Sequence, residues 1–329
     1  MKKAIFTTFF LFLITNLSYA QFSMRVAGAE FYRLGNIQKV GDLSDKILVV
    51  KLYEYDKKRI KKLQKKGEYA SAIKKLEESN EFLVNTVKTH WKLGNTIKTS
   101  EEVSADQYKD NENYLVLDIV DRSDAQMKRS VRHIFNYSMI HLTCGGKYLT
   151  YYSNTGGNFI DFEIKAAIEF FNTVFQATSK DIQWKSFPGF VNQNAGELKN
   201  MTLLIPGDIT KLKQDQIRSL YPYKFKMVSL KEISEKLENQ DDAYAFYWPQ
   251  HQDGSCGTGF HHGIYACKDA RLLALIPEKK VRVGTYGGNA PLVYEIFYSA
   301  SPGFYSVPLS KLLRKGTLEK LTENVGTNL

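Results

Sequence analysis

Two stretches of the chain repeat the same order of expected elements, and this order limits the fold more than any other feature. A short apolar run, Ile47–Val50 in one stretch and Met201–Ile205 in the other, predicts a buried strand. A helix, a second strand, a capped helix, a polar turn and a third strand are expected after each run. Because strands that alternate with helices pair in parallel under helical cover, the order predicts an α/β protein.

The second helix of each stretch is expected to begin with a capping box. Thr99 and Ser229 each stand three residues before a glutamate, so a hydroxyl and a carboxylate are available to bind the first backbone amides. These two residues are 130 positions apart, and so are Tyr114 and Tyr244, which begin the expected third strands. The shared spacing predicts two similar units in tandem.

Each unit is then expected to close with a β-hairpin. The turns would be Cys144-Gly145-Gly146 and Lys268-Asp269-Ala270, which separate alternating apolar runs. The predicted fold class is therefore α/β, with mixed β-sheets flanked by helices in two units of strand-helix-strand-helix-strand plus hairpin. Rossmann-like and thioredoxin-like orders both fit this description. We place the first unit at residues 21–185 and the second at residues 186–329.

Residues 1–20 have the three parts of a secretory signal peptide. Lys2 and Lys3 give a positive start, Ile5–Ile14 is mostly apolar, and Ser18-Tyr19-Ala20 offers small residues to a signal peptidase. The apolar run is shorter than the roughly 20 residues that cross a bilayer. We therefore expect cleavage near Ala20 and a soluble protein that is periplasmic or secreted.

Composition and charge indicate a globular protein with anionic partners. Hydrophobic residues make up 43% of the chain and charged residues 24%, which is enough apolar material for a core. The formal net charge is +10. Outside the cytoplasm the available anions are lipid phosphates, cell-wall polymers and acidic glycans, so nucleic acid is not an expected partner.

A dense basic run lies near the start of an expected helix over residues 56–91. Ile60 and Leu63 are one helical step apart and can hold this helix against the body of the protein. The candidate binding residues are Lys57, Lys58, Arg59, Lys61, Lys62, Lys65 and Lys66. Two interpretations remain open: a solvated helix face, or a footprint for an anionic membrane or cell-wall polymer.

A second candidate site combines histidine and cysteine. His251, Cys256, His261 and His262 lie within twelve residues, in what we expect to be a polar loop between strands. These side chains are ligands that zinc prefers, although their spacing matches no established zinc signature. Alternatively, Cys256 is a nucleophile and His261 or His262 is its base. The third interpretation is a mobile surface loop without a chemical role.

The same segment raises the question of a disulfide. An exported protein meets an oxidising compartment, where lone reactive thiols are a liability. We therefore hypothesise a bridge between Cys256 and Cys267, which leaves Cys144 as the odd cysteine.

A short part of the second unit resembles known proteins. The stretch from Leu203 through Tyr221-Pro222-Tyr223 to Tyr244 is similar to segments of exported bacterial proteins of unassigned function. The resemblance implies a location and carries no catalytic residues. The expected function is a non-enzymatic binding or interaction role at the cell envelope, with a protein partner or an anionic lipid or polymer. The alternative is a hydrolase that uses Cys256 with His261 or His262, or a metal held in the 251–267 segment.

Overall fold

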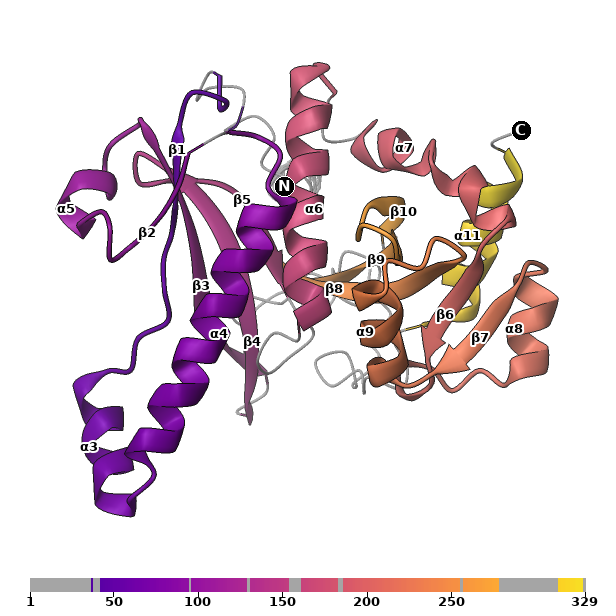
Figure 1. Cartoon of the computed structure of the whole chain (residues 1–329). Helices are drawn as coiled ribbons and strands as arrows, with labels where there is room; N and C mark the ends of the chain where they lie inside the picture. The colour runs from indigo at the N-terminus through magenta and orange to yellow at the C-terminus, as the bar shows by residue number, and fades with distance from the viewer. Residues whose placement is uncertain are drawn as a thin grey trace, which may run out of the picture.

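The computed structural model describes two five-stranded mixed sheets with helices packed around them (Figure 1). It describes residues 37, 42–94, 96–128, 131–153, 161–182, 186–254, 257–277 and 313–327. Within these ranges, side chains are described except at 121–128, 131–138, 153, 251–254 and 257–260. The α/β fold class predicted from the sequence is confirmed.

The first sheet has the strand order β2-β1-β3-β4-β5. Strand β1 is parallel to both β2 and β3, whereas β4 and β5 continue the sheet in antiparallel pairs. The elements of this unit are β1 (Ile47–Val50), α3 (Lys57–Lys66), α4 (Tyr69–His90), β2 (Ile97–Thr99), α5 (Ala105–Tyr108), β3 (Tyr114–Lys128), β4 (Val131–Cys144), β5 (Lys147–Ser153) and α6 (Asp161–Ser179).

The second sheet repeats this arrangement, with the order β10-β9-β8-β6-β7. Strand β6 is parallel to β7 and β8, and β9 and β10 follow in antiparallel pairs. The elements of this unit are α7 (Phe187–Asn192), η2 (Ala195–Lys199), β6 (Thr202–Pro206), η3 (Gly207–Ile209), α8 (Gln214–Leu220), β7 (Phe225–Val228), α9 (Leu230–Glu238), β8 (Tyr244–Gly254), β9 (Gly257–Ala266), β10 (Leu272–Pro277) and α11 (Lys315–Thr327). The two units therefore share one topology, and the 2-1-3 order of their three parallel strands is that of a doubly wound α/β sheet.

The two units also share the alignment of their strands. Ile47 lies opposite Tyr114 in the first sheet, and Thr202 lies opposite Tyr244 in the second. Since both tyrosines begin their strands, residues of β3 correspond to residues of β8 without a shift. This correspondence permits a comparison of equivalent positions in the two sheets.

Local signals explain where several elements begin and end. Gly145 and Gly146 have φ angles of 52° and 71°, the left-handed conformation that a tight hairpin turn requires. Gly67 has a φ of 71° and ends α3, so the single helix expected over residues 56–91 is in fact two helices. The Ser229 cap forms and begins α9, whereas the Thr99 box closes one turn and α5 begins only after Ser104.

Helix α6 occupies the space between the two sheets (Figure 1). Of its 19 residues, 13 are buried. The Trp91 and Phe175 rings pack edge to face at 6.1 Å on the side of the first unit, and the Phe162 ring lies 4.9 Å from that of Trp248 on the side of the second. One continuous hydrophobic core includes residues of both units, and the boundary at residues 185 and 186 stays a prediction.

The remaining helices cover the sheets unequally. Helix α4 packs beside α6 on the first sheet, α9 packs against α6 on the second, and α11 packs on β10 and α8. The short helix α5 covers a small apolar group on the other face of the first sheet, formed by Val49, Val103, Tyr108 and Val116. No helix within the described part of the chain combines the length and apolar character needed to cross a membrane.

Candidate functional site

The basic run forms α3, which lies with the start of α4 at the end of an arm that extends away from the sheets (Figure 1). The Asp56 carboxylate accepts a hydrogen bond from the Arg59 backbone amide at 2.7 Å and caps the helix. Gly67 ends it, and its amide donates to the Gln64 carbonyl at 3.1 Å. The chain thus fixes both ends of α3 through its own local residues.

The seven cations of α3 are all on the surface of the described structure. No residue of α3 is buried, and all seven basic side chains are exposed. Ile60 and Leu63 are half-buried, and α3 packs against α4. With about 100° of rotation per residue, the cations spread over an arc of roughly 200°. We call this exposed set of seven cations the basic face of α3.

The described residues do not neutralise the charges of the lysines on the basic face. None of its six lysines forms an ion pair with a described residue, whereas Lys92 pairs with Glu169 at 2.8 Å and Lys236 with Asp241 at 2.9 Å. The Arg59 guanidinium lies 4.7 Å from the centre of the Tyr55 ring. Four pairs of lysines stand four residues apart within α3. Each such like-charge pair destabilises a helix by about 0.2–0.5 kcal/mol.

The segment with histidine and cysteine is a β-hairpin, so the expectation of a polar loop is wrong. Strand β8 runs to Gly254, β9 begins at Gly257, and these two glycines pair across the hairpin. Pairing between β8 and β9 gives the backbone of this polar, glycine-rich segment its hydrogen-bond partners. Composition alone does not predict this pairing. Cys256 and the His251 side chain lie outside the described residues.

His261 and His262 are both buried but lie on opposite faces of β9. Successive side chains of a strand alternate, and in the ladder His261 lies opposite Gln250 while His262 lies opposite Pro249. The His262 Nδ1 atom is 2.7 Å from the Tyr247 hydroxyl. Burial lowers the pKa of His262 to about 3 and that of His261 well below its usual value. Both rings are therefore neutral at physiological pH.

This arrangement separates the two central candidates for a metal or catalytic site. A single ion bound on one face of β9 would not reach both rings. No group of three or more histidine, cysteine or acidic side chains that could hold a metal occurs among the described residues. Two candidate sites stay predictions because Cys256 is not described. They are the zinc site of His251, Cys256, His261 and His262, and the catalytic pair of Cys256 with His261 or His262.

The hypothesised bridge between Cys256 and Cys267 is wrong. Cys267 is a buried free thiol, and burial raises its pKa to about 12. It follows the last residue of β9, whereas Cys256 directly precedes the first residue. Strand β9, about 33 Å long, lies between the two positions in the chain, and a disulfide needs Cα atoms within about 7 Å. Cys144 is also a buried free thiol.

One polar cluster was not identified from the sequence. It lies at the carboxyl end of β1, between β1 and β3, where the strand order reverses. Ligands of open α/β sheets usually bind at such a point. Lys51 Nζ is 2.8 Å from Asp118 Oδ2, and His141 Nε2 is 3.8 Å from the same oxygen. The Tyr148 ring packs edge to face on His141 at 4.9 Å.

The chemistry of this cluster is that of an ion pair. Its hydrogen bond to Asp118 raises the pKa of Lys51, so the amine stays protonated and is not a nucleophile. The only signal in the sequence is a polar Asp118 inside an apolar strand. Strand pairing brings it beside Lys51, which is 67 residues away.

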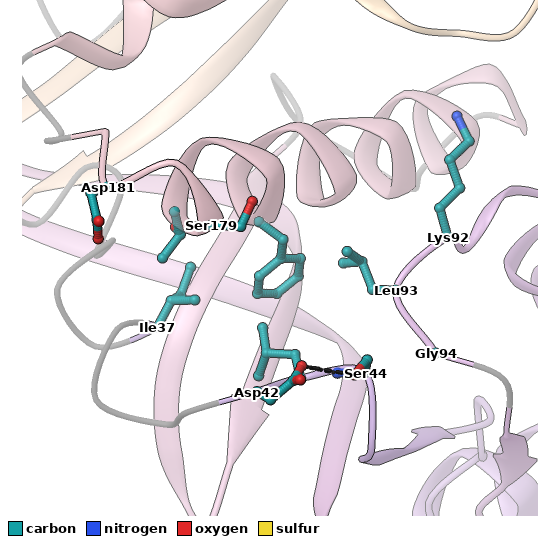
Figure 2. A pocket seen from close by; sticks show the side chains of 11 residues that line it. Ile37, Asp42, Ser44, Lys92, Leu93, Gly94, Ser179 and Asp181 are labelled. Atoms are coloured by element: carbon teal, nitrogen blue, oxygen red, sulfur yellow. Dashed lines mark hydrogen bonds between the residues drawn. The ribbon is translucent and has the colours of Figure 1, made fainter.

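A cavity of about 840 Å³ lies at the opposite end of the first sheet (Figure 2). The segment before β1, the link from α4 to β2 and the last turn of α6 form its wall. The Asp42 carboxylate accepts from the Ser44 amide and hydroxyl at 2.9 and 2.8 Å, and the Lys92 amine pairs with Glu169. The cavity lies at the amino ends of the parallel strands. Its charged groups either bind other residues of the protein, as Asp42 and Lys92 do, or lie apart from the other charged groups, as Asp181 does.

Comparisons with family models, with curated proteins and with solved structures found no match to this chain. Function is therefore inferred from the geometry of the described residues. The feature that the fold explains least is the basic face of α3, because it is exposed, its lysines have no ion pair with a described residue, and its like charges are unfavourable for the helix.

Proposed function

We propose that this chain is an exported, non-enzymatic binding protein that docks on an anionic component of the cell envelope through the basic face of α3. One observation carries the proposal: seven exposed cations share a ten-residue helix and its lysines have no ion pairs with described residues. Their mutual repulsion lowers helix stability. Concentrated positive potential attracts anionic partners and raises the rate at which they associate.

The titration of other described groups supports a binding role. A general acid or base works best with a pKa near the working pH. The pKa of His262 is lowered to about 3 by burial, and the pKa of Lys51 is raised by Asp118. Neither group is suited to proton transfer at neutral pH.

The proposed location rests on the sequence. Residues 1–20 have the organisation of a signal peptide, and residues 203–244 resemble exported bacterial proteins. In such a compartment a basic helix meets the phosphates and carboxylates of the envelope.

Retention on a phosphate-bearing matrix tests the proposal. The variant Lys57→Gln/Lys58→Gln/Lys61→Gln/Lys62→Gln removes four charges of the basic face. A matched control removes four exposed lysines elsewhere that have no ion pair with a described residue: Lys211→Gln/Lys213→Gln/Lys224→Gln/Lys268→Gln. Both variants have the same net charge, so any difference between them reports where the charge lies.

We expect the α3 variant to elute from phosphocellulose at clearly lower salt than the control variant. Its unfolding midpoint in urea should equal or exceed that of the unmodified protein, because like-charge pairs are relieved. Equal elution of the two variants would show that only net charge matters and would refute the proposal.

A further inference from the structure

We infer that the anionic component is the headgroup layer of a lipid bilayer, on which the arm of α3 and the start of α4 lies without inserting. This inference rests on the proposed function and adds the identity of the partner. It follows from the shape of the arm, from the kind of cation it presents and from the position of its apolar residues.

The shape of the arm fits a flat partner. Helix α3 lies at the far end of the arm, beyond the ends of most strands (Figure 1). Its cations cover a convex arc of roughly 200°. Proteins that hold a linear polyanion use a charged groove that follows the chain. A convex helix provides no such groove, whereas a planar surface can contact it.

The kind of cation fits many mobile phosphates. Six of the seven basic residues are lysines and one is Arg59. Lysine is a compact point charge on a flexible stem, whereas arginine binds a fixed phosphate through two parallel hydrogen bonds. Basic clusters near anionic leaflets contribute about 1 kcal/mol for each lysine or arginine. Diffuse attraction to a headgroup layer needs no fixed geometry.

The apolar residues of the arm argue against deep insertion. A helix that inserts exposes a broad apolar face, but α3 has only two apolar residues, Ile60 and Leu63, and both are half-buried. Tyr69 begins α4 just after the turn, and 37% of its surface is exposed. Tyrosine is favoured at the boundary between lipid and water, because its ring is apolar and its hydroxyl polar. Tyr69 is therefore placed at the headgroup boundary.

The two helices of the arm differ in charge. Helix α3 contains no acidic residue, whereas α4 exposes Glu77, Glu78 and Glu81. Lys74 is 3.9 Å from Glu78, so part of the positive charge of α4 is offset locally. Because α4 also exposes Lys74, Lys75 and Lys88, its charges balance, and an anionic surface attracts α3 more strongly than α4, which orients the arm.

Vesicle sedimentation tests this inference on the purified protein without residues 1–20, the form expected after signal-peptide cleavage. Vesicles of phosphatidylcholine alone are compared with vesicles that also contain phosphatidylglycerol, at low and at high salt. We expect binding only to the anionic vesicles and loss of binding at about 1 M salt, where charges are screened beyond about 3 Å. The four-glutamine variant of α3 should bind on the order of 10²–10³-fold more weakly, whereas the matched control variant should stay close to the unmodified protein.

The tip of the arm is tested separately. Tyr69→Ser should lower the vesicle partition coefficient about fivefold and leave elution from phosphocellulose unchanged. Tyr69→Trp should give a blue-shifted emission on anionic vesicles and none on phosphatidylcholine. An unchanged partition coefficient together with unshifted emission would overturn the placement of Tyr69 at the headgroup boundary.

The two proposals fail in different ways. If α3 controls elution from phosphocellulose but the protein ignores anionic vesicles at low salt, the lipid inference is refuted and an acidic polymer becomes the partner. If the α3 variant and its control behave alike in both assays, the proposed function is refuted as well.

Discussion

The two sheets have the same strand order and alignment, but the helices that follow them lie in different surroundings. Helix α6 is the next described element after β5 in the first unit, and α11 is the next described element after β10 in the second. Thirteen of the 19 residues of α6 are buried, compared with four of 13 in α11. The difference arises because α6 packs against both units, whereas α11 has a polar side that faces away from the second.

Equivalent positions on the sheets reflect this difference. Asp118 lies opposite His141 in the first sheet, and Trp248 lies opposite Gly263 in the second. Asp118 binds the half-exposed Lys51, whereas Trp248 packs on Phe162 of α6 and its Nε1 atom donates to Glu163 at 2.8 Å. The topology accepts an ion pair or an aromatic ring at this position. The element that covers the sheet decides which of them stabilises the protein.

The largest expected effect comes from placing the residue of the first unit into the second. Trp248→Asp would remove a ring that is 5% exposed and bring a second carboxylate beside Glu163. We expect the free energy of unfolding to fall by more than about 4 kcal/mol, since the change combines a cavity with a buried unpaired charge. Urea denaturation followed by fluorescence measures it.

A milder variant separates the two causes. Trp248→Phe keeps an aromatic ring against Phe162 and leaves Glu163 without this donor, which should lower the free energy of unfolding by about 1–3 kcal/mol. If Trp248→Asp lowers the free energy of unfolding by less than about 1 kcal/mol, the packing of α6 on the second sheet does not determine which residue this position needs. The comparison of the two units then fails.

The next effect concerns the pH dependence of stability and His262, whose equivalent position in the first unit is not a histidine. The position equivalent to His262 is Ile140, which lies opposite Ile119 as His262 lies opposite Pro249. The pKa of His262 is about 3 when folded, far below its ordinary value of 6.5. Below pH 6.5 the unfolded chain therefore binds a proton that the folded chain does not. Stability is fully present above that pH and falls as the pH drops towards 3.

His262→Ile should remove this dependence. Between pH 6.5 and 4.5, above the ordinary range of carboxylates, the unmodified protein should lose up to about 1.4 kcal/mol per pH unit through His262. His261, whose pKa is also lowered, adds a similar slope that the variant keeps. Tyr247→Phe removes the hydroxyl partner and should retain the full slope. An unchanged slope in His262→Ile would show that another group titrates in this window.

Much of the fold was predictable because it depends on local signals. The tertiary structure keeps several elements that local preference predicts: the glycine turn at residues 145 and 146, the Ser229 cap, and the apolar strands β1 and β6. The basic face was also predictable, because a cluster of charged residues in one segment is recognised without knowing its contacts. Gly67 shows the limit, since one glycine inside a long polar helix pattern is tolerated in some helices and ends this one.

The remaining features depend on contacts between distant parts of the chain. The polar segment of β8 and β9 resembled a loop because its glycines and histidines have no apolar alternation. Its strands are stabilised by ten paired positions and by burial of His261 and His262. Likewise, Phe162 marks α6 as apolar, but nothing in the sequence states that its partner is Trp248, 86 residues later. Such pairings require the packed structure.

The smallest effect tests whether the ion pair of the first unit matters to the fold. In the second unit Trp248 and Pro206 occupy the positions of Asp118 and Lys51, so the ladder forms without these charges. The Lys51 side chain is 47% exposed, and solvent weakens its attraction to Asp118. We expect Asp118→Asn to lower the free energy of unfolding by less than about 1 kcal/mol at low salt and to have no effect at about 1 M salt. Lys51→Gln should behave alike. A larger loss that persists at high salt would mean that Asp118 positions His141 through packing, and the two sheets would then differ in their cores as well as in their cover.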